Sequence, residues 1–127
     1  MQQRTLNRDR SQRQAQPDHP ICRGWKEFAL HDEYYLNPTI HGDATPLLQV
    51  AVKDKPVVVG WAYERPDGGR SFGTTLGHFY RNFQREDFRR MIVNGILWSS
   101  KVEIDKSGAR VDLNKADLAL PPEPSSD

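Results

Sequence analysis

The sequence predicts an α/β fold built from a β-hairpin and one long amphipathic helix. Two predicted strands, 57–63 and 71–76, indicate the hairpin, because residues 65–69 between them include a proline and two glycines that favour a turn. Apolar residues that recur with a helical period over 84–100 indicate the helix. A chain of 127 residues has room for one such domain at most.

The ordered part is expected to begin after residue 17. Residues 1–17 are rich in Arg and Gln and include few apolar side chains, so they predict a disordered leader. His19-Pro20-Ile21 follows as an extended entry or a short turn, since Pro20 keeps His19 out of the α region. Residues 23–31 are interpreted as a short helical or irregular piece.

A first strand is predicted over 47–52, and the polar residues 53–56 end it. The next segment, 57–63, is apolar and rich in β-branched residues, as in a strand buried on both faces. It should pair with 71–76. These segments predict that at least three strands precede the helix.

The helix predicted over 84–100 should be well buried. Asn82 is the expected N-cap, and Glu86 and Asp87 suit the positive end of the helix dipole. Residues 102–104 predict a short final strand. The apolar stripe consists of Phe88, Met91, Ile92, Gly95, Ile96 and Ser99, widened by Val93, Leu97 and Trp98. The expected organisation is therefore a leader over 1–17, a domain over 18–104 and a flexible tail over 105–127.

Charge and composition narrow the classes of partner. The formal net charge is +1, and the Arg-rich leader lacks interleaved aromatic residues, so we expect no nucleic-acid partner. No apolar run is long enough to span a bilayer, and the first residues do not resemble a secretory signal, so we expect no membrane partner and a cytoplasmic location. The single cysteine, Cys22, permits no intrachain disulfide and no cysteine zinc cluster.

Several short motifs occur in a fixed order. They are His19-Pro20-Ile21, Gly24, Asp32-Glu33-Tyr34-Tyr35, Trp61, Gly69-Arg70, Thr75-Leu76-Gly77-His78 and Asn94-Gly95-Ile96-Leu97-Trp98. In order and spacing the chain resembles the ThuA-like (trehalose-utilisation) domain family of the class I glutamine amidotransferase-like superfamily. The resemblance covers 18–104 and matches only the C-terminal half of that domain. One departure is Phe79-Tyr80, where the family often has an acidic residue after Gly-His.

The resemblance implies a partial flavodoxin-like three-layer fold and a role in the use of trehalose-type or oxidised sugars. It leaves the reaction open, and with it the question of whether the chain is an enzyme. No glutaminase nucleophile is expected, because Cys22 lies outside any strand-to-helix elbow. We expect a small-molecule sugar as ligand, and no cofactor or metal ion.

His78 and Glu33 are the candidate catalytic residues. His78 follows a glycine at the carboxyl end of a strand, where ligand crevices form in α/β folds. Asp32 and Glu33 are adjacent, so on an extended segment they point to opposite sides. A zinc set of His19, Glu33 and His78 is the weaker reading, because the residues are widely spaced. In the alternative reading these residues only cap strand ends or pair at the surface.

The candidate substrate-binding residues are chosen for their side-chain chemistry. Arg70 can clamp an anion or sugar hydroxyls, and aromatic rings can stack on a sugar face. The set consists of Arg70, Tyr35, Trp61, Asp32 and His19. For Trp61 the competing role is core packing, and for Arg70 it is a surface turn.

A second hypothesis comes from a different class of protein. If the strands of this chain lack their neighbours, their edges are exposed and favour pairing with another chain. The chain would then be a non-catalytic remnant or an interaction module that self-associates or needs a partner chain.

Overall fold

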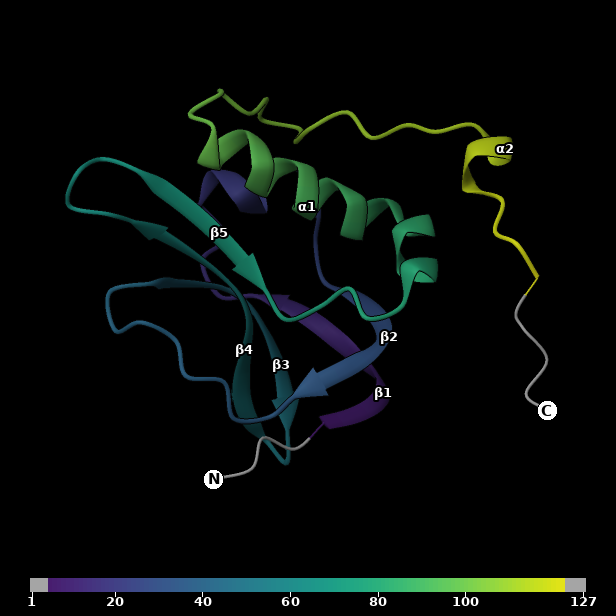
Figure 1. The fold of residues 1–127 in the computed structure, drawn as a ribbon, viewed down its shortest axis with the longest axis horizontal. Helices are drawn as coiled ribbons and strands as arrows, with labels where there is room; N and C mark the ends of the chain where they lie inside the picture. Colours follow the sequence, from purple (N-terminus) through teal and green to yellow (C-terminus); the bar gives the residue numbers. More distant parts are fainter. Residues whose placement is uncertain (1–4, 123–127) are drawn as a thin grey trace.

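The computed structural model describes residues 5–122 and contains one sheet covered on one side by a helix (Figure 1). The helices and strands are β1 (Thr5–Gln14), the 3₁₀ helix η1 (Pro20–Cys22), β2 (Phe28–Tyr35), β3 (Thr45–Val52), β4 (Lys55–Glu64), β5 (Arg70–Thr74), the 3₁₀ helix η2 (Tyr80–Gln84), α1 (Glu86–Ser99) and α2 (Lys115–Leu118). The predicted mixture of strands and one long helix is therefore confirmed.

Within the described residues the sheet has five strands in the order β2-β1-β3-β4-β5, and each pairing is antiparallel. The sheet is curled, and α1 lies against β5 and η1, while α2 stands away from the sheet (Figure 1). A flavodoxin-like arrangement of parallel strands is not confirmed by these pairings.

The predicted hairpin is present as β4 and β5, with Glu64 opposite Arg70 in the register. Its turn contains Gly68 at φ +91°, a conformation that glycine adopts without strain. A second tight turn joins β3 to β4 through Lys53 and Asp54, which both have positive φ angles (51° and 64°). Two successive residues of this kind match the right-handed twist of antiparallel strands.

The expected disordered leader is wrong for the described residues, because residues 5–14 form β1 between β2 and β3. The prediction relied on the scarcity of apolar residues. However, β1 is stabilised by backbone hydrogen bonds to β2 and β3 and by one buried polar pair. Gln12 Nε2 donates to the Tyr34 hydroxyl oxygen over 2.7 Å, and that hydroxyl donates to Leu30 O. Burial raises the pKa of Tyr34, which keeps its hydroxyl protonated.

The expected helical piece over 23–31 is also corrected, because β2 begins at Phe28. Phe28, Leu30, Asp32 and Tyr34 point inward and alternate with more exposed residues. The third inward residue, Asp32, is charged, so a prediction based on apolar residues alone does not detect this alternation. The predicted strand over 102–104 is absent from the described structure, where these residues form no regular element.

The helix predicted over 84–100 is confirmed as α1, with two corrections. Arg85 is its N-cap, whereas Asn82 belongs to η2 and bonds to β2. Ile96 is 58% exposed, while Asn94 is fully buried, so the buried face is turned relative to the predicted stripe. The reason is polar: Asn94 Nδ2 donates to Ile21 O and Arg23 O, and Asn94 Oδ1 accepts from Ala109 N–H.

Part of the expected flexible tail is packed onto α1. Ala109 and Val111 are buried, and Arg90 Nε donates to Ala109 O over 3.1 Å. The segment after residue 104 therefore belongs to the folded unit at least as far as Val111.

Candidate functional site

Glu33 and His78 form the pair that the sequence singles out as catalytic. Glu33 Oε2 lies 2.9 Å from His78 Nδ1, with the two side chains 20% and 48% exposed respectively. Glu33 comes from the edge strand β2, and His78 follows the other edge strand, β5. Because Glu33 engages Nδ1, the Nε2 atom of His78 remains for a ligand.

Asp32 lies beneath this pair and holds it in place. Its Oδ2 accepts from Gly77 N–H (2.9 Å) and from Asn82 Nδ2 (3.1 Å), and its Oδ1 accepts from His78 N–H (3.2 Å) and Glu33 N–H (2.8 Å). Asp32 has no exposed surface, so its expected substrate-binding role is corrected to a positioning role. The carboxylate joins the two edges of the curled sheet.

Phe79 packs between two imidazoles next to the pair. Its ring centroid lies 4.7 Å from that of His78 in an edge-to-face arrangement and 5.6 Å from that of His31. His31 Nδ1 lies 2.9 Å from Asp9 Oδ1, across the β1–β2 ladder. The departure from the family pattern at Phe79 therefore supplies an apolar wall beside His78.

His19 and Arg70 lie in a different place from His78. They line a cleft of about 570 Å³, which we name the polar cleft. It is lined by His19, Pro20, Asp43, Thr45, Ala62, Glu64, Arg70 and Trp98. Arg70 begins β5 and His78 follows its other end, and a strand of this length spans roughly 13 Å. The structure thus brings Glu33 to His78 and His19 to Arg70, but it does not join the two groups.

Tyr35 and Trp61 do not line the polar cleft. Tyr35 is two residues after Glu33 on β2 and so shares its face of the strand. Trp61 lies on β4 with its ring across Gly73 of β5, where a Cβ atom would overlap the indole. Trp25 and Trp98 are buried, as expected.

Sequence reasoning missed Glu64, Asp43, Thr45 and Asn82. One signal was available, since Glu64 and Arg70 are opposite charges at equal distances from the centre of a predicted turn. Asp43, Thr45 and Asn82 carried no comparable signal, because their neighbours are distant in the sequence.

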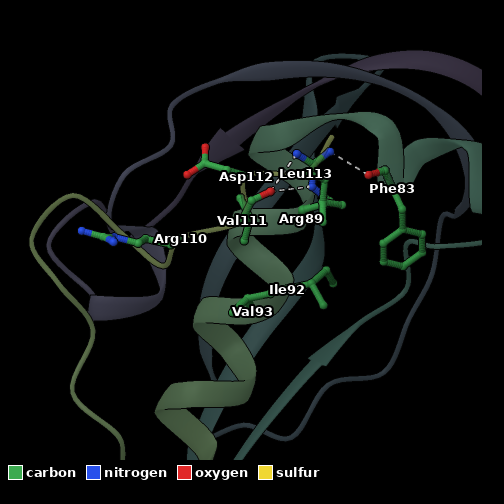
Figure 2. A pocket seen from close by; sticks show the side chains of 8 residues that line it. All are labelled: Phe83, Arg89, Ile92, Val93, Arg110, Val111, Asp112 and Leu113. Carbon is green, nitrogen blue, oxygen red and sulfur yellow. Dashed lines mark hydrogen bonds between the residues drawn. The ribbon is translucent and has the colours of Figure 1, made fainter. Parts of the chain in front are cut away.

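An apolar groove lies on the outer side of α1 (Figure 2). Its volume is about 330 Å³, and it is lined by Phe83, Arg89, Ile92, Val93, Arg110, Val111, Asp112 and Leu113. Arg89 holds its rim together by donating to Val111 O (2.9 Å) and to Phe83 O (3.0 Å) (Figure 2). The groove is therefore built by the helix and by the segment that follows it.

Three further properties bear on chemistry. The described residues contain no group of three or more His, Cys, Asp or Glu side chains placed to hold a metal ion. Burial raises the pKa of the Cys22 thiol to about 12, so that it is protonated and not a nucleophile at neutral pH. None of the helices in the described part of the chain has the length and apolar character needed to cross a bilayer.

Comparison with known proteins places the chain in a family. No curated protein and no solved structure gives a significant match. A family model described as ThuA, trehalose utilisation, matches residues 3–99, which include the elements from β1 to α1 and, with them, the His78–Glu33 pair and the lining of the polar cleft. The chain therefore belongs to the ThuA, or trehalose-utilisation, family.

Proposed function

We propose that the chain binds a carbohydrate at the His78–Glu33 pair, where Nε2 of His78 accepts a hydrogen bond from a sugar hydroxyl and is placed to act as a general base. The observation that carries the proposal is the 2.9 Å contact between Glu33 Oε2 and His78 Nδ1. A carboxylate at Nδ1 fixes the ring orientation and the tautomer, and so leaves the lone pair of Nε2 for a ligand. The family description supplies the class of ligand.

The surroundings of the pair support this role. Asp32 accepts hydrogen bonds from the backbone N–H groups of Gly77 and His78, and these bonds fix the backbone that carries the imidazole. Tyr35 stands on the same face of β2 as Glu33 and offers a ring for a sugar face. Rigid support of this kind is what general base catalysis requires of its proton acceptor.

Isothermal titration calorimetry with trehalose tests the proposal. His78→Ala should weaken binding about tenfold, because one hydrogen bond to the ligand is lost. Glu33→Gln keeps the shape but not the charge and should weaken binding less. Asp9→Ala is the matched control, since it removes a His–carboxylate contact of the same 2.9 Å length but leaves in place the His31 ring that packs on Phe79. Equal affinities in all three variants, or no binding heat in the unaltered chain, would overturn the proposal.

A cytoplasmic location, a glutamine amidotransferase-like relationship and the assignment of this chain to one half of a larger domain stay proposals. The buried, protonated Cys22 fits a reducing compartment. Expression in cells with a fluorescent tag at the C-terminus tests the location directly.

A second function, self-association as an interaction module, is favoured by the apolar groove. Phe83 and Leu113 at its rim are 41% and 49% exposed. Arg110 and Asp112 carry opposite charges and both line the groove. A second copy docked about a two-fold axis would place opposite charges together, which makes a copy of this chain the best occupant.

Analytical ultracentrifugation distinguishes this function from the first. The chain should sediment as a dimer at micromolar concentration, and Leu113→Glu should convert it to a monomer. Val102→Glu is the control, because Val102 is equally exposed but lies outside the groove. A monomer at all concentrations would exclude self-association.

A further inference from the structure

The polar cleft gathers side chains from four separate parts of the chain. His19 precedes η1, Asp43 lies in the turn before β3, and Thr45 begins that strand. Glu64 and Arg70 face each other across the β4–β5 hairpin, and Trp98 is near the end of α1. Its volume of about 570 Å³ lies within the usual range of small-molecule sites. Convergence of polar groups from distant segments on one cavity is typical of a binding site.

Arg70 is held in one position within this cleft. Its Nε lies 3.3 Å from Glu64 Oε1, its Nη1 donates to Trp98 O over 3.3 Å, and its guanidinium carbon lies 4.8 Å from the centroid of the Trp98 ring. The side chain is 29% exposed. A guanidinium carries five N–H donors, so donors remain for a ligand after these contacts are made.

His19 presents a defined tautomer to the same cleft. Ile21 N–H donates to His19 Nδ1 over 3.1 Å, which places the ring proton on Nε2. Burial lowers the pKa of His19; Glu64 opposes this effect, while Arg70 and Arg23 add to it. The neutral ring, 5.1 Å from Trp98, therefore offers one N–H donor.

The charges of the cleft select the kind of ligand. The lining residues in the described part of the chain include two carboxylates, Asp43 and Glu64, and one cation, Arg70, while Arg23 acts on His19 from outside the lining. Next to Asp43 and Glu64 the negative charge disfavours an acidic ligand, whereas hydroxyl groups donate to the carboxylates and accept from Arg70. Trp98 is 6% exposed, so it forms the floor beneath His19 and Arg70 and is not a stacking surface.

We infer that the polar cleft is a second carbohydrate subsite, specific for neutral saccharides and separate from the His78–Glu33 pair. The inference rests on the proposed function for its class of ligand. It adds a location, a set of residues and a preference for uncharged over acidic sugars. Glu64, Arg70 and His19 are the residues that contact the ligand.

Two-dimensional ¹H–¹⁵N NMR with trehalose or glucuronate as the titrant tests this inference. Trehalose should shift the amide signals of His19, Thr45 and Arg70, and glucuronate should leave them unchanged. Glu64→Ala should weaken the trehalose-dependent shifts about fivefold, because it removes an acceptor and frees Arg70. Asp67→Ala is the matched control, since Asp67 is an exposed carboxylate that pairs with an arginine, Arg65, in the same hairpin.

The position of the shifts separates the two proposals. Shifts at His19, Thr45 and Arg70 that Glu64→Ala weakens support the subsite, whatever happens at His78. Shifts confined to Glu33, Gly77 and Phe79 overturn the subsite and leave the proposed function standing. Stronger shifts with glucuronate than with trehalose overturn the preference for neutral sugars. If trehalose shifts no amide signals at either the polar cleft or the His78–Glu33 pair, both proposals are overturned.

Discussion

At the scale of single residues, the decisive group is a buried carboxylate. Asp32 has no exposed surface, yet it faces N–H donors from Gly77, His78 and Asn82 in place of a cation. Donors arranged in this way satisfy the hydrogen-bonding capacity of a buried carboxylate. The same contacts determine where His78 stands relative to Glu33.

Asp32→Ala should therefore be strongly destabilising. It leaves four N–H groups, one buried and three partly buried, without this acceptor, and a buried group costs about 1–3 kcal/mol, so the free energy of unfolding should fall by about 3 kcal/mol or more. Urea denaturation followed by circular dichroism measures the loss. Glu33→Ala, at a partly exposed neighbour, should cost less than half as much. Equal losses in the two variants would contradict the positioning role of Asp32.

His19 predicts a pH dependence of stability. Because burial lowers the folded-state pKa below the ordinary value of 6.5, the unfolded chain binds the proton more readily. The stabilisation is complete above pH 6.5 and is lost as the pH falls through the lowered folded-state pKa. His19→Asn retains a side-chain acceptor for Ile21 N–H and should flatten this acid limb in thermal melts between pH 7 and pH 5. If the melting temperature of this variant fell with pH as steeply as that of the unaltered chain, His19 would not be the source of the pH dependence.

At the scale of elements, the contact between α1 and β5 depends on Gly95. A Cβ atom at this position would overlap the Phe72 ring, so only glycine allows the helix to approach the strand this closely. This contact also determines the position of the last turn of α1, which carries Trp98, and Trp98 forms the floor of the polar cleft. The helix–strand distance and the shape of the cleft are thus linked.

Gly95→Ala should destabilise the protein by about 1–3 kcal/mol, the usual cost of overpacking. Phe72→Leu in the same chain should recover part of the loss, because a smaller side chain makes room for the methyl group. Gly42→Ala, where a Cβ atom meets nothing within 4 Å, is the control for the general effect of the substitution. Thermal denaturation of the unaltered chain, the two single variants, the double variant and the control gives the comparison, and additive effects of Gly95→Ala and Phe72→Leu would rule out the contact.

At the scale of the whole molecule, side-chain amides and guanidinium groups tie distant segments to the sheet and helix. Asn94 joins residues 21–23 to Ala109, and Arg23 Nη1 donates to Ile104 O over 2.6 Å. Arg89 and Arg90 bind the backbone at Val111 and Ala109. The segment that follows α1 is consequently part of the structure that shapes both the apolar groove and the back of the helix.

A chain that ends at Asp105 should accordingly lose about 3 kcal/mol of stability, because Asn94, Arg89 and Arg90 all lose backbone partners and the buried Ala109 and Val111 are removed. A chain that ends at Ala119 keeps these contacts and should stay within about 0.5 kcal/mol of the original. Chemical denaturation of both shortened chains measures the difference. Similar stabilities would mean that residues 106–119 contribute nothing.

The sequence alone determined the features that depend on neighbours along the chain. The hairpin follows from the turn at 65–69, α1 follows from its apolar period, and the family follows from motifs in order. The opposite orientations of Asp32 and Glu33 follow from the alternation of a strand. Each of these rests on conformational preferences that act over a few residues.

Only the tertiary structure decided which polar groups meet. The curl of the sheet brings β2 to the end of β5, so Asp32 receives N–H donors from Gly77 and His78 far along the chain, and Glu33 reaches His78. The length of β5 keeps Arg70 and His19 apart from that pair, although all four residues were assigned to one site. β1 escaped prediction because its stability comes from ladders with β2 and β3, and partners of this kind leave no local pattern.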